Sequence, residues 1–226
     1  MTDRIETNPT GAVRRMPMFP LGSVLFPELG LPLRIFEPRY VRMLQECVAD
    51  EGEFGVVLIE RGSEVGGGEV RLRVATTARI LDVQPQDDGT YGVFCVGTGR
   101  VEVIEWLPDA PYPVAVVADY DDVPDEVLDS DSDNDSGEDY EGVVNDVIRR
   151  LRSTLARRSE ANLAAAPATI ELSPDWEVAL WQACGLVPAT PLDDYELLAT
   201  RSVRDRIAAL DALIVTSNDH VRFHMS

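Results

Sequence analysis

The 226-residue sequence contains no lysine, and all twenty of its basic residues are arginine. A Walker A loop needs a lysine to reach the nucleotide phosphates, so the chain is not a standard P-loop ATPase. A serine nucleophile activated by lysine is excluded for the same reason. The only two histidines, His220 and His224, lie near the C-terminus, and no GxSxG nucleophile elbow occurs. We therefore expect no enzymatic activity and no catalytic residues.

Cysteine is also scarce, and its three positions, Cys47, Cys95 and Cys184, lie far apart without any CxxC pair. An odd, scattered set is typical of reduced, buried thiols in a cytosolic protein rather than of disulfides or a zinc site. No apolar run approaches the roughly 20 residues needed to cross a bilayer, and the polar first fifteen residues contain no secretory signal. The sequence predicts a cytoplasmic protein.

The residues that could bind a metal do not have the spacing of a known metal site. His220 and His224 have i, i+4 spacing, but Ser217-Asn218-Asp219 predicts a helix end before them, and the further ligands of a tetrahedral site are missing. The acidic segment does not fit an EF-hand loop, because Ser136 stands where glycine is needed and Gly142 where glutamate is needed. We expect no metal and no cofactor.

The net charge of −20 is concentrated in one short segment: residues 119–141 contain 12 acidic residues and no basic one. The regions on either side of this segment have much smaller net charges. Nucleic-acid-binding proteins usually have the opposite sign of charge, gathered on one face. DNA and membrane surfaces are therefore excluded as expected partners, and RNA is disfavoured.

The N-terminal half predicts a β-rich domain. Residues 1–14 are expected to be disordered. From Met16 onward, prolines separate short extended segments, and Pro38 opens a helix that ends at Gly52, with Val41, Leu44 and Val48 on its apolar face.

Strands are predicted from Phe54 to Ile59, along Arg71–Ile80 with a bulge at Leu81, from Tyr91 onward, and from Pro113 to Ala118. The EVGGGE segment is expected to be a flexible loop between the first two of these strands. Asp88-Gly89 predicts a hairpin turn. Gly97 and Gly99 predict a sharply curved corner of the barrel. Residues 15–121 should form a compact, partly closed barrel.

The C-terminal half predicts helices. Residues 122–141 have almost no apolar content and are expected to be a flexible acidic linker. In 142–226, Ser173, Thr190 with Asp193, and Ser202 are predicted helix starts, and Gly185 a helix stop. The first helix has an apolar stripe, and the last is expected to bury Val203, Ile207, Leu210, Leu213 and Ile214. The fold class is therefore α+β, with a barrel followed by a helical bundle.

Three blocks of sequence resemble the N-terminal, substrate-binding domain of Lon proteases. They are MPMFPLGSVLFPELGLPLRIFEPRYVRM (Met16–Met43), FGVVLIERGSEVGG (Phe54–Gly67) and VATTARILDVQPQDDGTYGVFCVGTGRVEV (Val74–Val103). Ala75 stands where the family usually has glycine. The resemblance implies a PUA-like pseudo-barrel followed by a helical bundle, here as a stand-alone bacterial domain. It also implies binding of protein substrates, as in Lon proteases and cereblon, and supplies no catalytic residues.

The leading hypothesis is accordingly a non-enzymatic module that binds unfolded or partly folded polypeptides, and that works with a protease or its subunits. Its binding surface is predicted among the apolar residues that follow the first prolines, rimmed by arginine and glutamate. These candidates are Leu31, Leu33, Phe36, Tyr40 and Met43, with barrel core as the competing interpretation of each.

Two alternatives stay open. One is a PUA-like RNA-binding protein, motivated by the PUA-like barrel that the resemblance implies; the negative charge of the barrel region speaks against it, although Arg71, Arg73 and Arg79 share one strand face. The other is a small-molecule receptor that uses a cleft between the barrel and the bundle. Salt-sensitive RNA binding would support the first, and a bound ligand in the cleft would support the second.

Overall fold

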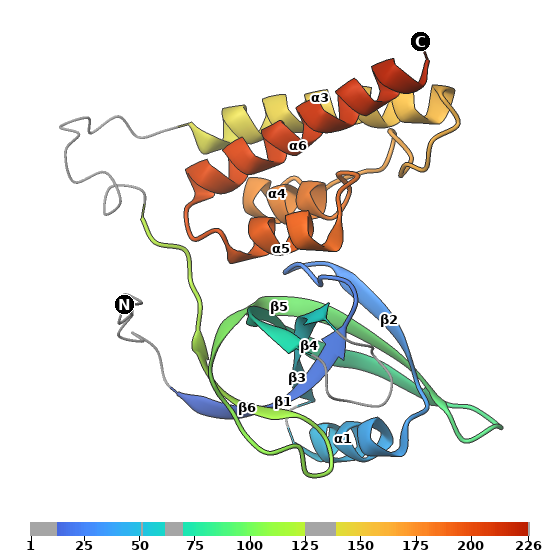
Figure 1. The fold of residues 1–226 in the computed structure, drawn as a ribbon, viewed down its shortest axis with the longest axis vertical. Coiled ribbons are helices and arrows are strands. Elements are labelled where there is room, and N and C mark those ends of the chain that lie inside the picture. Colours follow the sequence, from blue (N-terminus) through green and yellow to red (C-terminus); the bar gives the residue numbers. More distant parts are fainter. Residues whose placement is uncertain (1–12, 51, 62–69, 125–138, 226) are drawn as a thin grey trace. The chain divides into compact units, whose positions relative to one another are not determined.

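A computed structural model describes residues 13–50, 52–61, 70–124 and 139–225 (Figure 1). The chain divides into two compact units. The barrel unit contains the residues up to Gly22 together with Gly30–Asp121, and the helical unit contains Ser23–Leu29 together with the residues from Asp122 onward. Residues 1–12 of the predicted disordered N-terminus, the EVGGGE loop and most of the acidic linker lie outside the described residues. The prediction was wrong for Arg14, which is the first residue of a strand and pairs with Val117.

The barrel unit is built on one mixed sheet of six strands in the order β2-β5-β4-β3-β1-β6. A further pairing of β5 with β6 closes five of these strands into a ring, and β1 and β3 are parallel. This arrangement confirms the predicted barrel. The strands are β1 (Arg14–Leu21), β2 (Gly30–Ile35), β3 (Glu53–Arg61), β4 (Val70–Pro85), β5 (Tyr91–Trp106) and β6 (Val114–Asp119).

Two irregularities bend the long β4–β5 hairpin. The register shifts between Ile80 and Asp82, which confirms the bulge predicted at Leu81, and again where Thr77 and Ala78 face Gly99 and Gly97. Such bulges increase local twist and let a sheet curl. The first half of β5 can thereby pair with β2 and its second half with β6.

The predicted turn at the end of this hairpin is confirmed. Gly89 has a φ of 80°, which favours glycine. The backbone amide of Thr90 donates to the Asp88 carboxylate over 3.1 Å.

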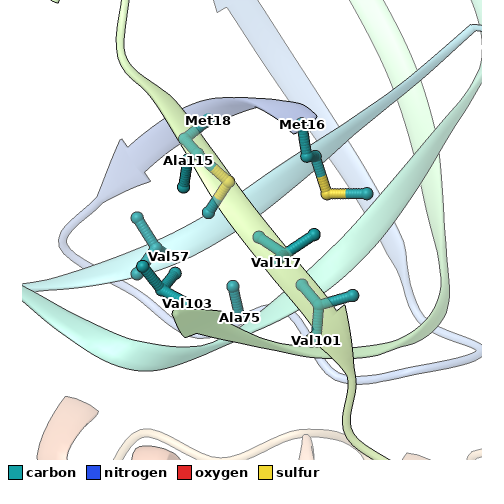
Figure 2. Close-up of a cluster of buried hydrophobic side chains, with 8 residues drawn as sticks. All are labelled: Met16, Met18, Val57, Ala75, Val101, Val103, Ala115 and Val117. Carbon is teal, nitrogen blue, oxygen red and sulfur yellow. The ribbon is translucent and has the colours of Figure 1, made fainter. Parts of the chain in front are cut away.

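The ring encloses a cluster of methionine, valine and alanine side chains, all with less than 5% of their surface exposed. Figure 2 shows these side chains converging from several strands. Small residues on some strands leave room for the methionines of β1. The cluster consists of Met16, Met18, Val57, Ala75, Val101, Val103, Ala115 and Val117.

Helix α1 (Pro38–Ala49) follows β2 and contacts β1 and β3. Its buried residues are Tyr40, Met43, Leu44 and Cys47, at the i, i+3, i+4, i+7 spacing of one helix face. Of the predicted apolar face, Leu44 is buried as expected, but the prediction was wrong for Val48, which is 57% exposed. The ring centroids of Tyr40 and Phe19 are 4.4 Å apart. The buried face of α1 therefore includes the large side chains of Tyr40 and Met43.

The helical unit contains α3 (Tyr140–Glu160), α4 (Trp176–Cys184), α5 (Pro191–Ala199) and α6 (Val203–His224). Helices α3 and α6 lie side by side, and α3 also contacts α4 (Figure 1). Among the predicted stripe residues of α6, Ile207, Leu210 and Ile214 are buried. The capping box of Thr190 with Asp193, the cap at Ser202 and the stop at Gly185 are all confirmed.

Three helix boundaries differ from the predictions. Helix α3 begins at Tyr140, because the Asp139 carboxylate accepts the amide of Gly142 over 2.9 Å and caps the helix two residues before the expected start. Asp175, not Ser173, caps α4, because its carboxylate accepts the amide of Glu177. Helix α6 continues through Asn218 to His224, and Asn218 donates a hydrogen bond to Thr154 of α3 over 2.8 Å.

The segment Ser23–Leu29, which connects β1 to β2, packs within the helical unit. Leu25 and Phe26 are 4% and 2% exposed, and the Phe26 ring centroid lies 6.0 Å from that of Trp181 in α4. Leu29 lies so close to Gly185 that a side chain at residue 185 would collide with it. The N-terminal region of the sequence therefore supplies part of the core of the helical unit.

Arg206 of α6 is the largest polar side chain inside this unit, with only 1% exposed. Its guanidinium group lies 4.0 Å from the Trp181 ring centroid and donates to both carboxylate oxygens of Asp122. It also donates to the carbonyl of Thr200 over 2.7 Å. Because a buried charge is tolerated only when it is paired, these contacts hold residue 122 and the α5–α6 turn together.

Candidate functional site

The five predicted binding residues separate into two groups in the structure. Tyr40 and Met43 are 3% and 0% exposed, so they belong to the barrel core, and their assignment to the binding surface is corrected here. They lie on the face of α1 that packs on the strands. Leu31 and Leu33 are half-buried on β2, and Phe36, between β2 and α1, is 55% exposed.

Phe36 lies at the rim of an open groove of about 540 Å³ in the barrel unit. The groove runs along the exposed side of α1 and is completed by the β4–β5 turn at Gly89. Its apolar part is provided by Phe36, Pro38 and Val41, and its polar part by Arg42, Gln45 and Glu46. Ligand-binding clefts commonly combine apolar lining with a few polar groups in this way.

The polar side of the groove is fixed by Glu46. Its carboxylate accepts hydrogen bonds from the hydroxyl group of Tyr112 and, over 2.8 Å, from the guanidinium group of Arg42. These two interactions, the tyrosine first, lower the pKa of Glu46 and keep it ionised. Burial raises the pKa of Tyr112 to about 12, so its hydroxyl remains a donor at neutral pH.

Phe94 and Leu81 add exposed apolar surface that the sequence analysis did not select. Phe94 is 45% exposed on β5, opposite Pro32, and Leu81 is 57% exposed in the β4 bulge. The signal for Phe94 was present, because its neighbours Val93 and Cys95 point inward and alternation places residue 94 outward. The Phe94 ring lies over Gly30, where a Cβ atom would be 2.8 Å from its Cζ.

The arginines that suggested RNA binding are all paired with carboxylates. Arg71 donates two hydrogen bonds to Asp109 and lies 4.6 Å from the Trp106 ring centroid. Arg73 pairs with Glu102 at 3.1 Å, and Arg79 pairs with Glu53 at 3.0 Å. This strand face therefore presents neutralised ion pairs, and these three arginines do not support the RNA alternative.

The helical unit has a second depression, of about 510 Å³, between α3 and the segment that leads into α4. Its arginines are engaged within the unit, because Arg149 pairs with Asp146 at 2.8 Å and Arg152 donates to the carbonyl of Ile170. We assign no ligand to this depression. Its lining consists of Glu141, Asn145, Ile148, Arg149, Arg152, Leu172, Ser173, Pro174, Trp176 and Ala179.

The cysteines are buried and unpaired, as the sequence predicted. Burial raises the pKa of Cys47 to about 11 and that of Cys95 and Cys184 to about 12, so the reactive thiolate form is disfavoured. No group of three or more potential metal ligands occurs in the parts of the chain that the structure describes. Within the same parts, every helix is too short or too polar to span a bilayer.

Comparisons with known proteins agree with this architecture. The sequence profile of the ATP-dependent protease La (LON) substrate-binding domain matches residues 15–215. A Lon protease of Anaeromyxobacter dehalogenans is 31% identical over 99 residues, which are 43% of this chain and 12% of that protein. Lon protease 2 of Myxococcus xanthus matches with the same identity and the same shares. The similarity thus covers a small fraction of these relatives.

Two solved structures have a similar fold. The crystal structure of a Lon N-terminal domain protein from Xanthomonas campestris aligns with a TM-score of 0.58 and 25% identity, covering 88% of this chain and 98% of that one. The N-terminal domain of a Lon protease from the Mycobacterium avium complex aligns with a TM-score of 0.59 and 14% identity, covering 89% and 98%. The second likeness concerns the fold alone.

Proposed function

Because the chain belongs to the family of ATP-dependent protease La (LON) substrate-binding domains, matched over residues 15–215, we propose that it binds unfolded or partly folded polypeptides without catalysing a reaction. The matched relatives are proteases of which this domain is a small part. In the proposal, the chain holds a polypeptide for a protease in the cytoplasm. Three buried, unpaired thiols are consistent with that compartment.

The exposure of Phe36 at the rim of the groove is the observation that carries the proposal. A phenylalanine that leaves 55% of its surface in water, beside Pro38 and Val41, offers apolar area to a partner. Full burial of such a side chain contributes about 1.5–3 kcal/mol, so covering the exposed half of Phe36 contributes about half of that. Unfolded polypeptides expose the complementary apolar side chains, whereas folded proteins bury most of theirs.

The polar side of the same groove favours recognition of a main chain. Glu46 and Arg42 hold each other in place and leave hydrogen-bonding atoms at the surface, since both side chains are about half exposed or more. A polypeptide segment brings both amide donors and carbonyl acceptors. The groove can therefore satisfy backbone polar groups while Phe36 and Val41 cover apolar side chains.

The experiment that tests the proposal measures binding of a labelled, reduced and carboxymethylated protein, which stays unfolded, by fluorescence anisotropy. Phe36→Asp should weaken binding at least tenfold, or about 1.4 kcal/mol, because it removes apolar contact and adds a charge. Val48→Asp is the matched control: Val48 is 57% exposed on α1 but does not line the groove. Equal affinities of a folded Phe36→Asp variant and the parent chain would reject Phe36 as part of the surface.

A further inference from the structure

Strand β2 is the edge of the six-stranded sheet. Its only strand neighbour among the described residues is β5, paired antiparallel from Gly30 opposite Val96 to Ile35 opposite Tyr91. Each of the other five strands pairs with at least two strands, because the pairing of β5 with β6 closes them into a ring. Among the described strands, β2 is the one that pairs with a single strand, so along its whole length it has a side to which a further strand can be added.

Pro32 shows which backbone groups point to that side. Proline has no N–H, so an intact ladder requires Pro32 and Phe94 to be a non-hydrogen-bonded pair of the antiparallel β2–β5 ribbon. Backbone groups alternate along a strand, so Gly30, Pro32 and Arg34 direct theirs away from β5. The free side then offers the amides of Gly30 and Arg34 and the carbonyls of all three residues.

The side chains beside this edge are apolar on both faces of the sheet. Leu31 and Leu33 lie on one face and are only half-buried, although they follow the same alternation as the fully buried Ile35. On the other face, the ring of Phe94 lies over Gly30 and is 45% exposed. A strand paired with β2 would cover Leu31 and Leu33 with alternate side chains and approach Pro32 and Phe94 with the others.

We propose that the free edge of β2 binds an extended segment of another polypeptide as an additional strand. The inference rests on the proposed function, because it states how a further part of the same polypeptide is held beyond the groove at Phe36: by main-chain hydrogen bonds to Gly30, Pro32 and Arg34, and by alternating apolar side chains against Leu31 and Leu33. Strand addition of this kind takes affinity from main-chain hydrogen bonds, which any sequence can make, and specificity from the contacts of alternate side chains. The main-chain contribution suits a protein that binds many unfolded sequences.

A second copy of this chain fits the edge less well than an unrelated segment. An antiparallel pair of β2 strands centred on Pro32 would place two prolines opposite each other and lose both hydrogen bonds of that pair. Centred on Arg34, the pair would place two arginines directly opposite each other, which is destabilising. An unfolded polypeptide can choose a register that avoids both conflicts.

The first test leaves the protein unaltered. The probes are nine-residue peptides with alternating leucine and threonine, N-methylated at the leucine amides in one peptide and at the threonine amides in another. In a bound strand only one of these amide sets faces β2. One methylated peptide should therefore bind at least tenfold more weakly than the parent peptide, and the other should bind equally well. Equal effects of the two methylation patterns would overturn the proposal.

The second test uses the full chain with Arg34→Pro and Arg34→Ala. Both variants lose the ion pair with Asp88, which joins Nη2 and Oδ2 at 2.7 Å, but only proline removes the outward amide. Pro32 already occupies a position whose backbone groups point away from β5. The hydrogen bonds between β2 and β5 should therefore survive a second proline at residue 34. Arg34→Pro should weaken binding of the parent peptide about fivefold to tenfold relative to Arg34→Ala, the loss of one hydrogen bond.

The outcomes separate the inference from the proposed function. Unchanged binding by a folded Arg34→Pro variant, together with loss in Phe36→Asp, would overturn strand addition and leave polypeptide binding intact. Absence of any binding to the unfolded protein would overturn both. A concentration-dependent dimer that Arg34→Pro dissociates would show that a second copy occupies the edge and would also overturn the proposal.

Discussion

Gly55 lies directly opposite Met18 in the parallel pairing of β3 with β1, and the methionine sulfur occupies the space that a side chain at residue 55 would need. A Cβ atom on Gly55 would be 2.6 Å from Sδ of Met18 and 3.2 Å from Sδ of Met16. Both methionines belong to the buried cluster of the barrel. The missing side chain at residue 55 is therefore what allows β1 to fill the barrel interior.

Gly55→Ala should destabilise the chain by about 1–3 kcal/mol, because the buried methionines must move in a core without free space. The free energy of unfolding in urea measures the effect. Gly99→Ala is the control, since a Cβ there would meet no atom within 4 Å. A loss of stability of the same size in both variants would show that backbone flexibility, not the contact with Met18, is responsible.

Arg206→Ala should destabilise the chain by about 3 kcal/mol or more. The change removes the hydrogen bonds that the guanidinium group donates to the Asp122 carboxylate, and it removes the guanidinium group from the face of the Trp181 ring. Urea unfolding followed by tryptophan fluorescence is the measurement. The matched control is Arg149→Ala, in which the lost partner of Asp146 is an arginine with a 75% exposed side chain. That change should cost less than about 1 kcal/mol, and equal costs would contradict the role assigned to the buried pair.

Asp194 gives a pH-dependent prediction. Burial in α5, and then the neighbouring Asp193, raise the pKa of Asp194 from 3.8 to about 6. The folded state thus binds a proton more tightly than the unfolded state, so this group's contribution to stability falls as pH rises from about 4 to about 6. Asp194→Asn should be more stable than the parent chain by about 1 kcal/mol at pH 7, and equally stable below pH 4.

Urea midpoints measured between pH 4 and pH 7 test this prediction. Asp193→Asn serves as a comparison with the opposite sign, because hydrogen bonds from Thr190 lower the pKa of Asp193. A difference between Asp194→Asn and the parent chain that stayed constant over this pH range would show that the carboxyl group does not titrate as described.

The local signals in the sequence predicted most of the fold. Asp88-Gly89, the change of parity at Leu81 and the capping box of Thr190 with Asp193 each depend on neighbouring residues only, and each is confirmed. The buried face of α1 was predicted wrongly because i, i+4 spacing fits Val48 as well as Cys47. Only the position of the strands beneath the helix decides that Tyr40 and Met43 are buried.

The candidate site was predictable in part for the same reason. The proline-rich stretch drew attention to Phe36, Leu31 and Leu33, which keep exposed surface, but whether an apolar residue is core or surface depends on what packs against it. Phe94 was missed although alternation with the buried Val93 and Cys95 places it on the outer face. The end of α6 was misplaced because Asn218 has a tertiary partner, Thr154, that local sequence does not reveal.

The packing of Ser23–Leu29 within the helical unit means that the chain enters that unit twice, once after Gly22 and again after Asp121. A fragment made of residues 122–226 would therefore lack the buried Leu25 and Phe26 and would expose the surface that Phe26 covers on Trp181. A fragment ending at residue 121 would carry these two side chains without a partner. The boundary between the two units is consequently a poor place to cut the gene, although it is the place that the sequence alone would suggest.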